Sequence, residues 1–104
     1  MPTTYRVIIS PKAFADIDEI IEHVKQDSPA NAAAMIDGML EAALSLRMLP
    51  YRYRVYLHRK IAAKTVHAMP IPPFILYYRV DERTRVVRVL SIRHGARRQP
   101  RRFE

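Results

Sequence analysis

Apolar residues follow one another closely at the start of the chain and then change to a helical spacing. Tyr5 to Ser10 (YRVIIS) is a short run rich in β-branched residues that stops at Pro11, which predicts a β-strand. Ser10 and Pro11 together predict an N-cap and a proline in the first turn of a helix. Apolar residues then recur at spacings of three and four, with acids mostly between them. The predicted buried stripe of this helix is Phe14, Ile17, Ile20, Ile21 and Val24.

The same signals predict a second helix. Asp27 and Ser28 precede Pro29, and the later Pro50 requires the helix to end at or before Leu49. Roughly three residues join the two helices, so they are expected to form a helical hairpin. The predicted buried stripe of the second helix is Ala32, Met35, Ile36, Met39, Leu40, Ala43 and Leu44.

Beyond Pro50 the pattern changes to short apolar runs separated by turn residues, which predicts strands. The last run, Val86–Arg93, mixes apolar and charged residues at both sets of alternate positions. We therefore expect it to be a central strand of the sheet, largely covered on both faces. Tyr51 to Lys64 has no clear period and is interpreted as a loop that can hold a short strand. The predicted strands are Thr65–Met69, Phe74–Val80 and Val86–Arg93, with turns at Pro70–Pro73 and Asp81–Thr84.

These elements predict an α+β fold with the order β-α-α-β-β-β. The helical hairpin is expected to pack on one face of a small, mainly antiparallel sheet, which leaves the other face for a different task. The 104 residues have the length of a single domain, 1–104. The basic tail from about residue 96 lacks apolar periodicity, so we expect it to be mobile.

Composition narrows the class of protein. With 49% hydrophobic and 27% charged residues, the chain is expected to be globular rather than disordered. It has no cysteine, which excludes disulfides and thiolate zinc sites. The N-terminus does not resemble a secretory signal, and the uncharged stretch Thr65–Tyr78 is too short to span a membrane. We therefore expect a soluble cytoplasmic protein.

The charge is distributed unevenly along the chain. Residues 1–49 carry four bases and seven acids, whereas residues 50–104 carry fourteen bases and three acids, giving net charges of −3 and +11. Such asymmetry predicts a polyanionic or acidic partner for the second half. The alternative is that the surplus only keeps a small protein soluble.

The sequence does not support cofactor or metal chemistry. The two glycines, Gly38 and Gly95, cannot form a phosphate-binding loop, and the four histidines have no helical pairing typical of a metal site. We therefore expect no cofactor and no metal.

Arginine, tyrosine and histidine gather in the second half instead. Arginine forks bind phosphates and carboxylates, and aromatic rings stack on bases, so the mixture suits nucleic acid. A metal-independent ribonuclease could use His94 flanked by Arg93 and Arg97. The alternative is that the tyrosines pack in or against the core and the arginines form a solvated face. The residues concerned are Arg52, Tyr53, Arg54, Tyr56, Tyr77, Tyr78, Arg79, Arg93, His94, Arg97 and Arg98.

Several segments together resemble a known family. They are the Ser-Pro pairs at both helix starts, LRMLP at the end of the hairpin, and the segments PFILYYRVDE and VLSIRHGARRQP. In this order they resemble the ParE branch of the RelE/ParE superfamily of type II toxins, over nearly the whole chain. The resemblance implies a small bacterial toxin, encoded with a partly disordered antitoxin in a module of the kind that stabilises plasmids. ParE-type toxins are understood to act on DNA gyrase, whereas RelE-type relatives cut messenger RNA on the ribosome.

The residues help to choose between these branches. RelE-type nucleases resemble one another in carrying basic residues such as arginine on the middle strands, an arginine on the last strand, and a Tyr or His near the C-terminus. Here Phe74 and Ile75 stand where such an arginine is expected, and no tyrosine follows Tyr78, which weakens the nuclease hypothesis, whereas Arg93 and His94 keep it open.

Three functional hypotheses follow. The first is a ParE-like, non-catalytic inhibitor of DNA gyrase, neutralised by an acidic antitoxin in a hetero-oligomer. Its predicted target-binding residues are Arg79, Arg93, His94, Arg97 and Arg98. The second is a RelE-like, ribosome-dependent endoribonuclease, with His94, Arg93 and Arg97 as candidate catalytic residues. The third is a nucleic-acid-binding module without toxicity.

Overall fold

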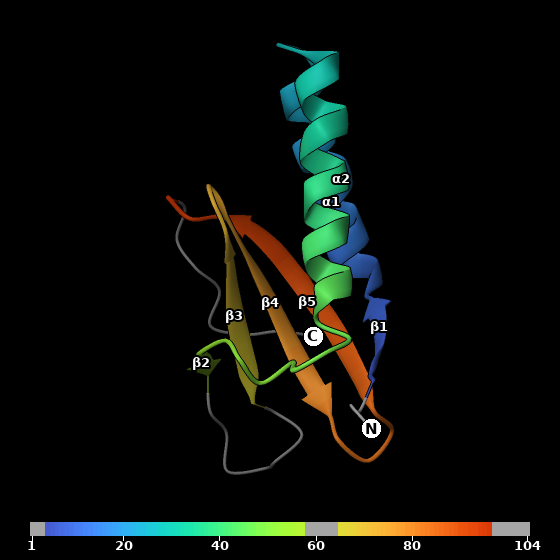
Figure 1. Ribbon diagram of the computed structural model, residues 1–104. Coiled ribbons are helices and arrows are strands. Elements are labelled where there is room, and N and C mark those ends of the chain that lie inside the picture. The colour runs from blue at the N-terminus through green and yellow to red at the C-terminus, as the bar shows by residue number, and fades with distance from the viewer. Residues whose placement is uncertain (1–3, 58–64, 97–104) are drawn as a thin grey trace.

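A five-stranded sheet and two helices make up the fold in the computed structural model, which describes residues 4–57 and 65–96. The strand order is β1-β5-β4-β3-β2, with β1 parallel to β5 and the other pairs antiparallel (Figure 1). This confirms the α+β prediction and the central position of the last strand. The elements are β1 (Arg6–Ile9), α1 (Pro11–Lys25), α2 (Pro29–Ser45), β2 (Val55–Leu57), β3 (Val66–Ile71), β4 (Phe74–Asp81) and β5 (Val86–His94).

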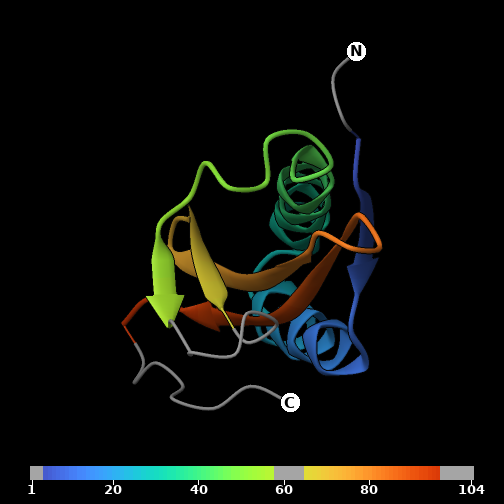
Figure 2. The same cartoon turned by 90° about the horizontal axis from the view of Figure 1, so that it is seen from below.

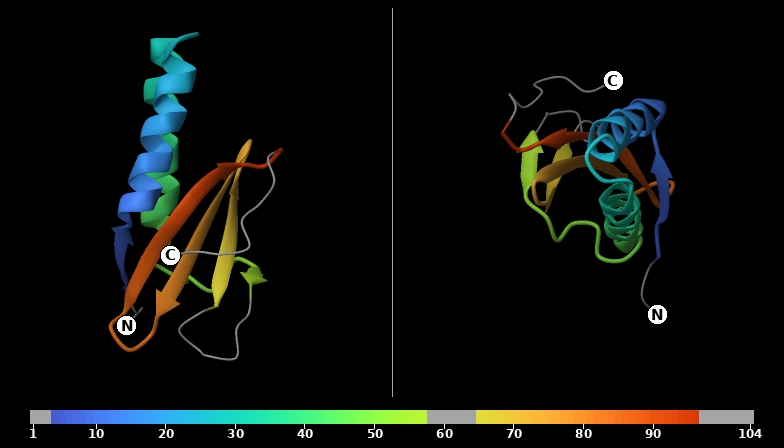
Figure 3. Two further views of the ribbon diagram at one scale, coloured as in Figure 1. Left: turned by 180° about the vertical axis from the view of Figure 1, so that it is seen from behind. Right: turned by 90° about the horizontal axis from the view of Figure 1, so that it is seen from above.

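Both helices begin where the sequence predicts. The Ser10 hydroxyl accepts a hydrogen bond from the N–H of Ala13 at 3.1 Å, and the Ser28 hydroxyl accepts one from Asn31 at 3.3 Å. A proline occupies the first turn of each helix, where its missing N–H costs no hydrogen bond. The helices form a hairpin that extends beyond the ends of the strands (Figure 1). β2 and β3 lie on the side of the sheet away from β1 (Figure 2, Figure 3).

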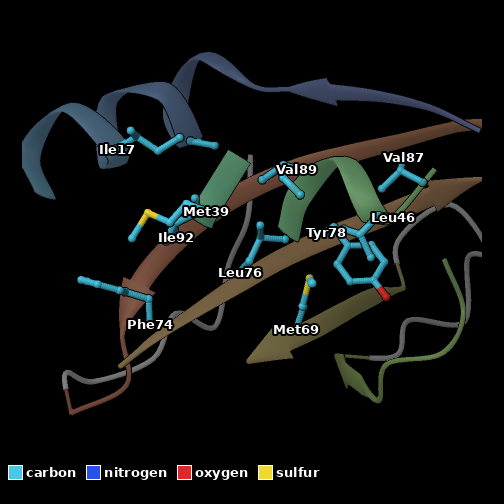
Figure 4. Packing of buried hydrophobic residues seen from close by; sticks show 12 residues of the cluster. Ile17, Met39, Leu46, Met69, Phe74, Leu76, Tyr78, Val87, Val89 and Ile92 are labelled. Atoms are coloured by element: carbon cyan, nitrogen blue, oxygen red, sulfur yellow. The ribbon is translucent and has the colours of Figure 1, made fainter. Parts of the chain in front are cut away.

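The main core lies between the helical hairpin and one face of the sheet. Tyr78 is fully buried there, and its hydroxyl donates to the carbonyl of Pro50 at 2.5 Å, which fixes the loop that follows α2. Figure 4 shows how the side chains of the two helices meet those of the strands. The buried core residues are Ala13, Ile17, Met39, Ala43, Leu46, Met69, Phe74, Leu76, Tyr78, Val87, Val89 and Ile92.

Two residues of the predicted helical stripes are exposed. Phe14 is 52% exposed and Leu44 is 50% exposed, so both expectations were wrong. The buried residues of α1 are the predicted Ile17 together with Ala13 and Asp16, which were not predicted, and Asp16 is only 8% exposed. The reason is tertiary, because α1 turns toward polar groups of β5 that Asp16 satisfies.

β3 is longer than predicted and continues through Pro70, so the turn is confined to Pro72 and Pro73. The N–H of Ala68 donates to the carbonyl of Arg54 at 3.0 Å, away from β4. Pro70, two residues later, has its nitrogen on the same outer side, where β2 no longer runs. Its missing N–H therefore removes no bond between β3 and β4.

The opposite face of the sheet, which we call the helix-free face, has its own small apolar cluster of Val66, Ala68, Tyr77 and Leu90. Tyr77 and Tyr78 are adjacent and both fully buried, and they belong to different clusters. Packing of these tyrosines, one of the two alternatives drawn from the sequence, is therefore confirmed. In the described part of the chain, neither helix is long and apolar enough to cross a membrane.

Candidate target-binding site

β1 is shorter than β5, so the end of β5 pairs with β4 on one side and has no neighbouring strand on the side of β1. The two strands pair over Val86 to Val89, and the N–H of Ser10 donates to the carbonyl of Val89 at 3.0 Å. The Ser10 hydroxyl then donates to the carbonyl of Leu90 at 3.2 Å. On this side, the remaining residues of β5, Ser91–His94, lie beside α1.

A buried carboxylate of α1 takes the place of the missing strand. The Asp16 Oδ2 accepts hydrogen bonds from the Ser91 hydroxyl at 2.8 Å and from the Ile92 N–H at 3.0 Å. Lys12 donates to the other oxygen of the same carboxylate. Asp16 thereby fixes the strand end that carries Arg93 and His94, two of the predicted site residues.

A cleft of about 440 Å³ lies between α1 and the neighbouring ends of β4 and β5. Its walls carry both signs of charge, so it does not select for one kind of ion. Among the residues that the structure describes, no group of three His, Asp or Glu side chains is arranged to hold a metal ion. The walls include Lys12, Glu19 and His23 on one side and Phe74, Arg93 and His94 on the other.

His94 is turned toward the helices. Its ring contacts Phe74, a core residue, edge-on at 5.5 Å between centroids. The His94 Nδ1 accepts a hydrogen bond from the backbone N–H of Ala96 at 3.0 Å. A neutral imidazole that accepts through Nδ1 carries its proton on Nε2, so the outer nitrogen is a donor. This arrangement suits binding to an anion or carbonyl better than proton abstraction.

Arg93 belongs to the other face of the sheet. It lies opposite Ile75 on β4, and Ile75 packs against the cluster of the helix-free face. Burial raises the pKa of the neighbouring Tyr77 to about 12, a shift supported by Tyr56 and opposed by the positive charges of Arg93 and Arg54. Consecutive strand residues point to opposite faces, so the side chains of Arg93 and His94 leave β5 in opposite directions, although both residues line the cleft.

Arg79, another predicted residue, also lies on the helix-free face. In the register of the two strands, Arg79 of β4 lies directly opposite Arg88 of β5. The two carboxylates that follow it closely in the sequence, Asp81 and Glu82, accept hydrogen bonds from other residues. Asp81 accepts from the N–H groups of Arg83 and Thr84, and Glu82 accepts from two tyrosines. Arg97 and Arg98, the remaining predicted site residues, lie outside the described residues, as does nearly all of the predicted mobile tail.

Two arginines of the helix-free face were missed by the sequence analysis. They are Arg6 on β1 and Arg88 on β5, both exposed. The sequence held a signal for Arg88, because two apolar residues, Val87 and Val89, flank it in the strand, and both are fully buried in the structure. For Arg6, the face of the sheet on which it lies follows from the parallel pairing of β1 with β5. The sequence of a short N-terminal strand does not reveal that pairing.

Comparison with known proteins agrees with this fold. A sequence model of the family described as the ParE toxin of the type II toxin-antitoxin system, parDE, matches residues 7–99. The chromosomal ParDE toxin–antitoxin system from P. aeruginosa has a similar chain, with a TM-score of 0.69 and 20% identity over 88% of this chain and 97% of that chain.

Two further solved structures share the fold. The RelBE2 toxin–antitoxin complex from Mycobacterium tuberculosis matches with a TM-score of 0.61 and 24% identity, covering 91% of this chain and 95% of that one. The RelE–RelB complex from Pyrococcus horikoshii OT3 matches with a TM-score of 0.64 and 18% identity, covering 91% and 99%. No curated protein matches the sequence. The match to the family model over residues 7–99 is the finding that identifies the chain, which belongs to the ParE family of type II toxin–antitoxin toxins.

Proposed function

We propose that this toxin arrests growth by acting on DNA gyrase and that a cognate antitoxin neutralises it. The observation that carries the proposal is the family match over residues 7–99, because ParE-type toxins are understood to act on gyrase. The target contact is assigned to the basic residues Arg79, Arg93, His94, Arg97 and Arg98. We expect this contact to weaken as the salt concentration rises, because exposed charges are screened.

The geometry around His94 favours a binding role over catalysis. A ribonuclease of the alternative type would need His94 and Arg93 at the same phosphate, but their side chains leave β5 toward opposite faces of the sheet. The Nδ1 of His94 is already an acceptor for a backbone N–H, so Nε2 is protonated in the neutral ring. Phe74 and Ile75 add no positive charge at the start of β4.

An acidic antitoxin is the partner that fits the charge of the second half of the chain. The three similar structures come from toxin–antitoxin systems or complexes, as their descriptions state. The net charge of this chain is +8, so an acidic segment would gain Coulomb energy along the basic strands. The expected assembly is a hetero-oligomer of toxin and antitoxin.

The second candidate is a RelE-like endoribonuclease that cuts messenger RNA on the ribosome. The observation in its favour is that two of the similar structures are RelE-type complexes, with TM-scores of 0.61 and 0.64. In that case His94 and Arg93, with Arg97, would carry the catalysis.

Brief expression without antitoxin separates the two candidates. We expect DNA breaks and an SOS response with intact transcripts, and inhibition of supercoiling when purified toxin is added to gyrase. New transcript ends inside translated codons, with intact DNA, would instead establish the ribonuclease. The absence of both signals would refute both targets.

A His94→Gln variant adds a second criterion. Gln still donates a hydrogen bond but cannot relay a proton, so it should keep most of a binding-based inhibition and abolish RNA cleavage. Lys25→Gln is the matched control, because Lys25 ends α1, pairs with Glu22 at 2.6 Å and is not one of the residues assigned to the target contact.

A further inference from the structure

The strands carry far more positive than negative charge. Four arginines lie on them, whereas Asp81 is the one carboxylate on the described strands. Asp81 is occupied by its own turn, where it accepts from two backbone N–H groups. All four arginines alternate with residues of the main core, which assigns them to the helix-free face. They are Arg6, Arg79, Arg88 and Arg93.

Two of these arginines bring like charges close together on neighbouring strands. Arg79 and Arg88 are direct cross-strand partners, and like charges in this position repel each other. Arg88 is exposed, as is Arg6 on the next strand, and neither forms an ion pair within the residues that the structure describes. A polyanion bound on this face would attract both guanidinium groups and offset their mutual repulsion.

The size of the patch suits several phosphates rather than one. Its arginines come from three neighbouring strands, β4, β5 and β1, which span about 10 Å at the usual strand spacing. Along β5, Arg88 and Arg93 are about 16 Å apart at about 3.3 Å per residue. Double-stranded DNA carries one charge per about 1.7 Å of its axis, so a patch of this length meets several phosphates.

The described part of the face favours a duplex over a single strand. Single-stranded nucleic acid is bound by aromatic rings on which bases stack. Tyr77 is fully buried and cannot offer its ring, because Tyr56 packs on it at 4.8 Å between centroids. The arginines are left to make contacts with the backbone, which position a protein on DNA without reading its sequence.

The acids of the chain are concentrated on the opposite side. The two helices hold six carboxylates, and the helical hairpin lies on the other face of the sheet. The molecule therefore has an acidic side and a basic side, and such a charge distribution orients it as it approaches a polyanion.

We infer that the helix-free face binds the phosphate backbone of double-stranded DNA, independently of sequence, through Arg6, Arg79, Arg88 and Arg93. This goes beyond the proposed action on gyrase and does not depend on it. If gyrase is the target, the toxin would meet the DNA that the enzyme holds as well as the enzyme itself.

The test measures binding of the purified full chain to a short fluorescent DNA duplex at several salt concentrations. Each phosphate contact contributes about −0.9 to the slope of log affinity against log salt. The variant R6Q/R88Q should therefore have a slope smaller in magnitude by about 1.8. At about 0.1 M salt its affinity should be roughly 60-fold lower. Arginines elsewhere in the chain contribute equally to both proteins, so the difference reports the two replaced side chains.

The matched control is K25Q/R47Q, which removes the same net charge. Lys25 ends α1 and Arg47 follows α2, and both are exposed outside the strands. This variant should keep the wild-type slope. Equal losses in both variants would show attraction to net charge alone and would overturn the inference.

Two other results would also overturn it. One is the absence of duplex binding at low salt by a chain whose thermal unfolding shows that it is folded. The other is tighter binding to single-stranded RNA than to the duplex. A chain that binds the duplex but leaves gyrase unaffected would refute the proposed target while supporting this inference.

Discussion

Replacing Asp16 with Ala tests the most unusual contact of the fold. Asp16 is 8% exposed and accepts two hydrogen bonds from β5, from the Ser91 hydroxyl and the Ile92 N–H. No neighbouring strand is present on that side to replace it. The variant would leave both donors in a buried place without an acceptor, although no strand or helix is removed.

The expected cost follows from those two donors. A buried donor left without a partner costs about 1–3 kcal/mol, and bonds to charged groups lie toward the upper end. The gain in helix propensity from Asp to Ala offsets about 0.5 kcal/mol. The pair with Lys12 adds little, because the Lys12 side chain is 53% exposed. The free energy of unfolding should therefore fall by about 3 kcal/mol, which lowers the melting temperature by roughly 12 °C or more.

Urea unfolding measures this change, and amide exchange locates it. Exchange at the Ile92 N–H should accelerate more than exchange at the N–H groups of β3. Asp18→Ala on the exposed side of α1 is the control and should stay within about 0.5 kcal/mol of wild type. In a double-mutant cycle, Asp16→Ala and Ser91→Ala should be coupled by about 1 kcal/mol. A D16A protein with the wild-type urea midpoint would refute the reasoning.

Three further predictions concern stability. Tyr78→Phe leaves the Pro50 carbonyl without its donor and should cost about 1–2 kcal/mol in urea unfolding; an unchanged midpoint would contradict the bond. Ser10→Ala should cost more than Ser28→Ala, about 2 against about 1 kcal/mol, because only the Ser10 hydroxyl also binds β5; equal costs would argue against that second contact. Hydrogen bonds from two tyrosines lower the pKa of Glu82, so its carboxylate stabilises the fold above about pH 4.3 and this contribution is lost as the pH falls further. E82Q should therefore lose less stability than wild type in thermal melts between about pH 5 and pH 2, and parallel losses would show that Glu82 is not linked to folding.

Local chemistry was enough to predict much of this protein. Each helix begins at a serine followed by proline, because a hydroxyl cap and a fixed backbone angle act within a few residues. The run of apolar and aromatic residues from Phe74 predicted β4, because side chains of these types favour strands. The order of elements and the segments PFILYYRVDE and VLSIRHGARRQP pointed to the family that the sequence match then identified.

The tertiary structure decided which side of each element is buried. The apolar Phe14 is exposed and the acidic Asp16 is buried, the reverse of what the helical pattern predicted. The reason is that the hydrogen-bonding groups at the end of β5 require an acceptor, and only the folded chain brings Asp16 there. Pro70 can lie within β3 because β2 does not extend along β3 as far as Pro70, so its missing N–H removes no bond of the sheet.

The candidate site depended on the same long-range effects. Arg93 and His94 are neighbours in sequence, yet the pleat of β5 sends them to opposite faces. Arg79 and Arg88 are nine positions apart and become direct partners only through the β4–β5 register. A sequence records spacing along the chain, whereas the repulsion of two charges depends on their distance in space, so the basic face could be located only after the strands were paired.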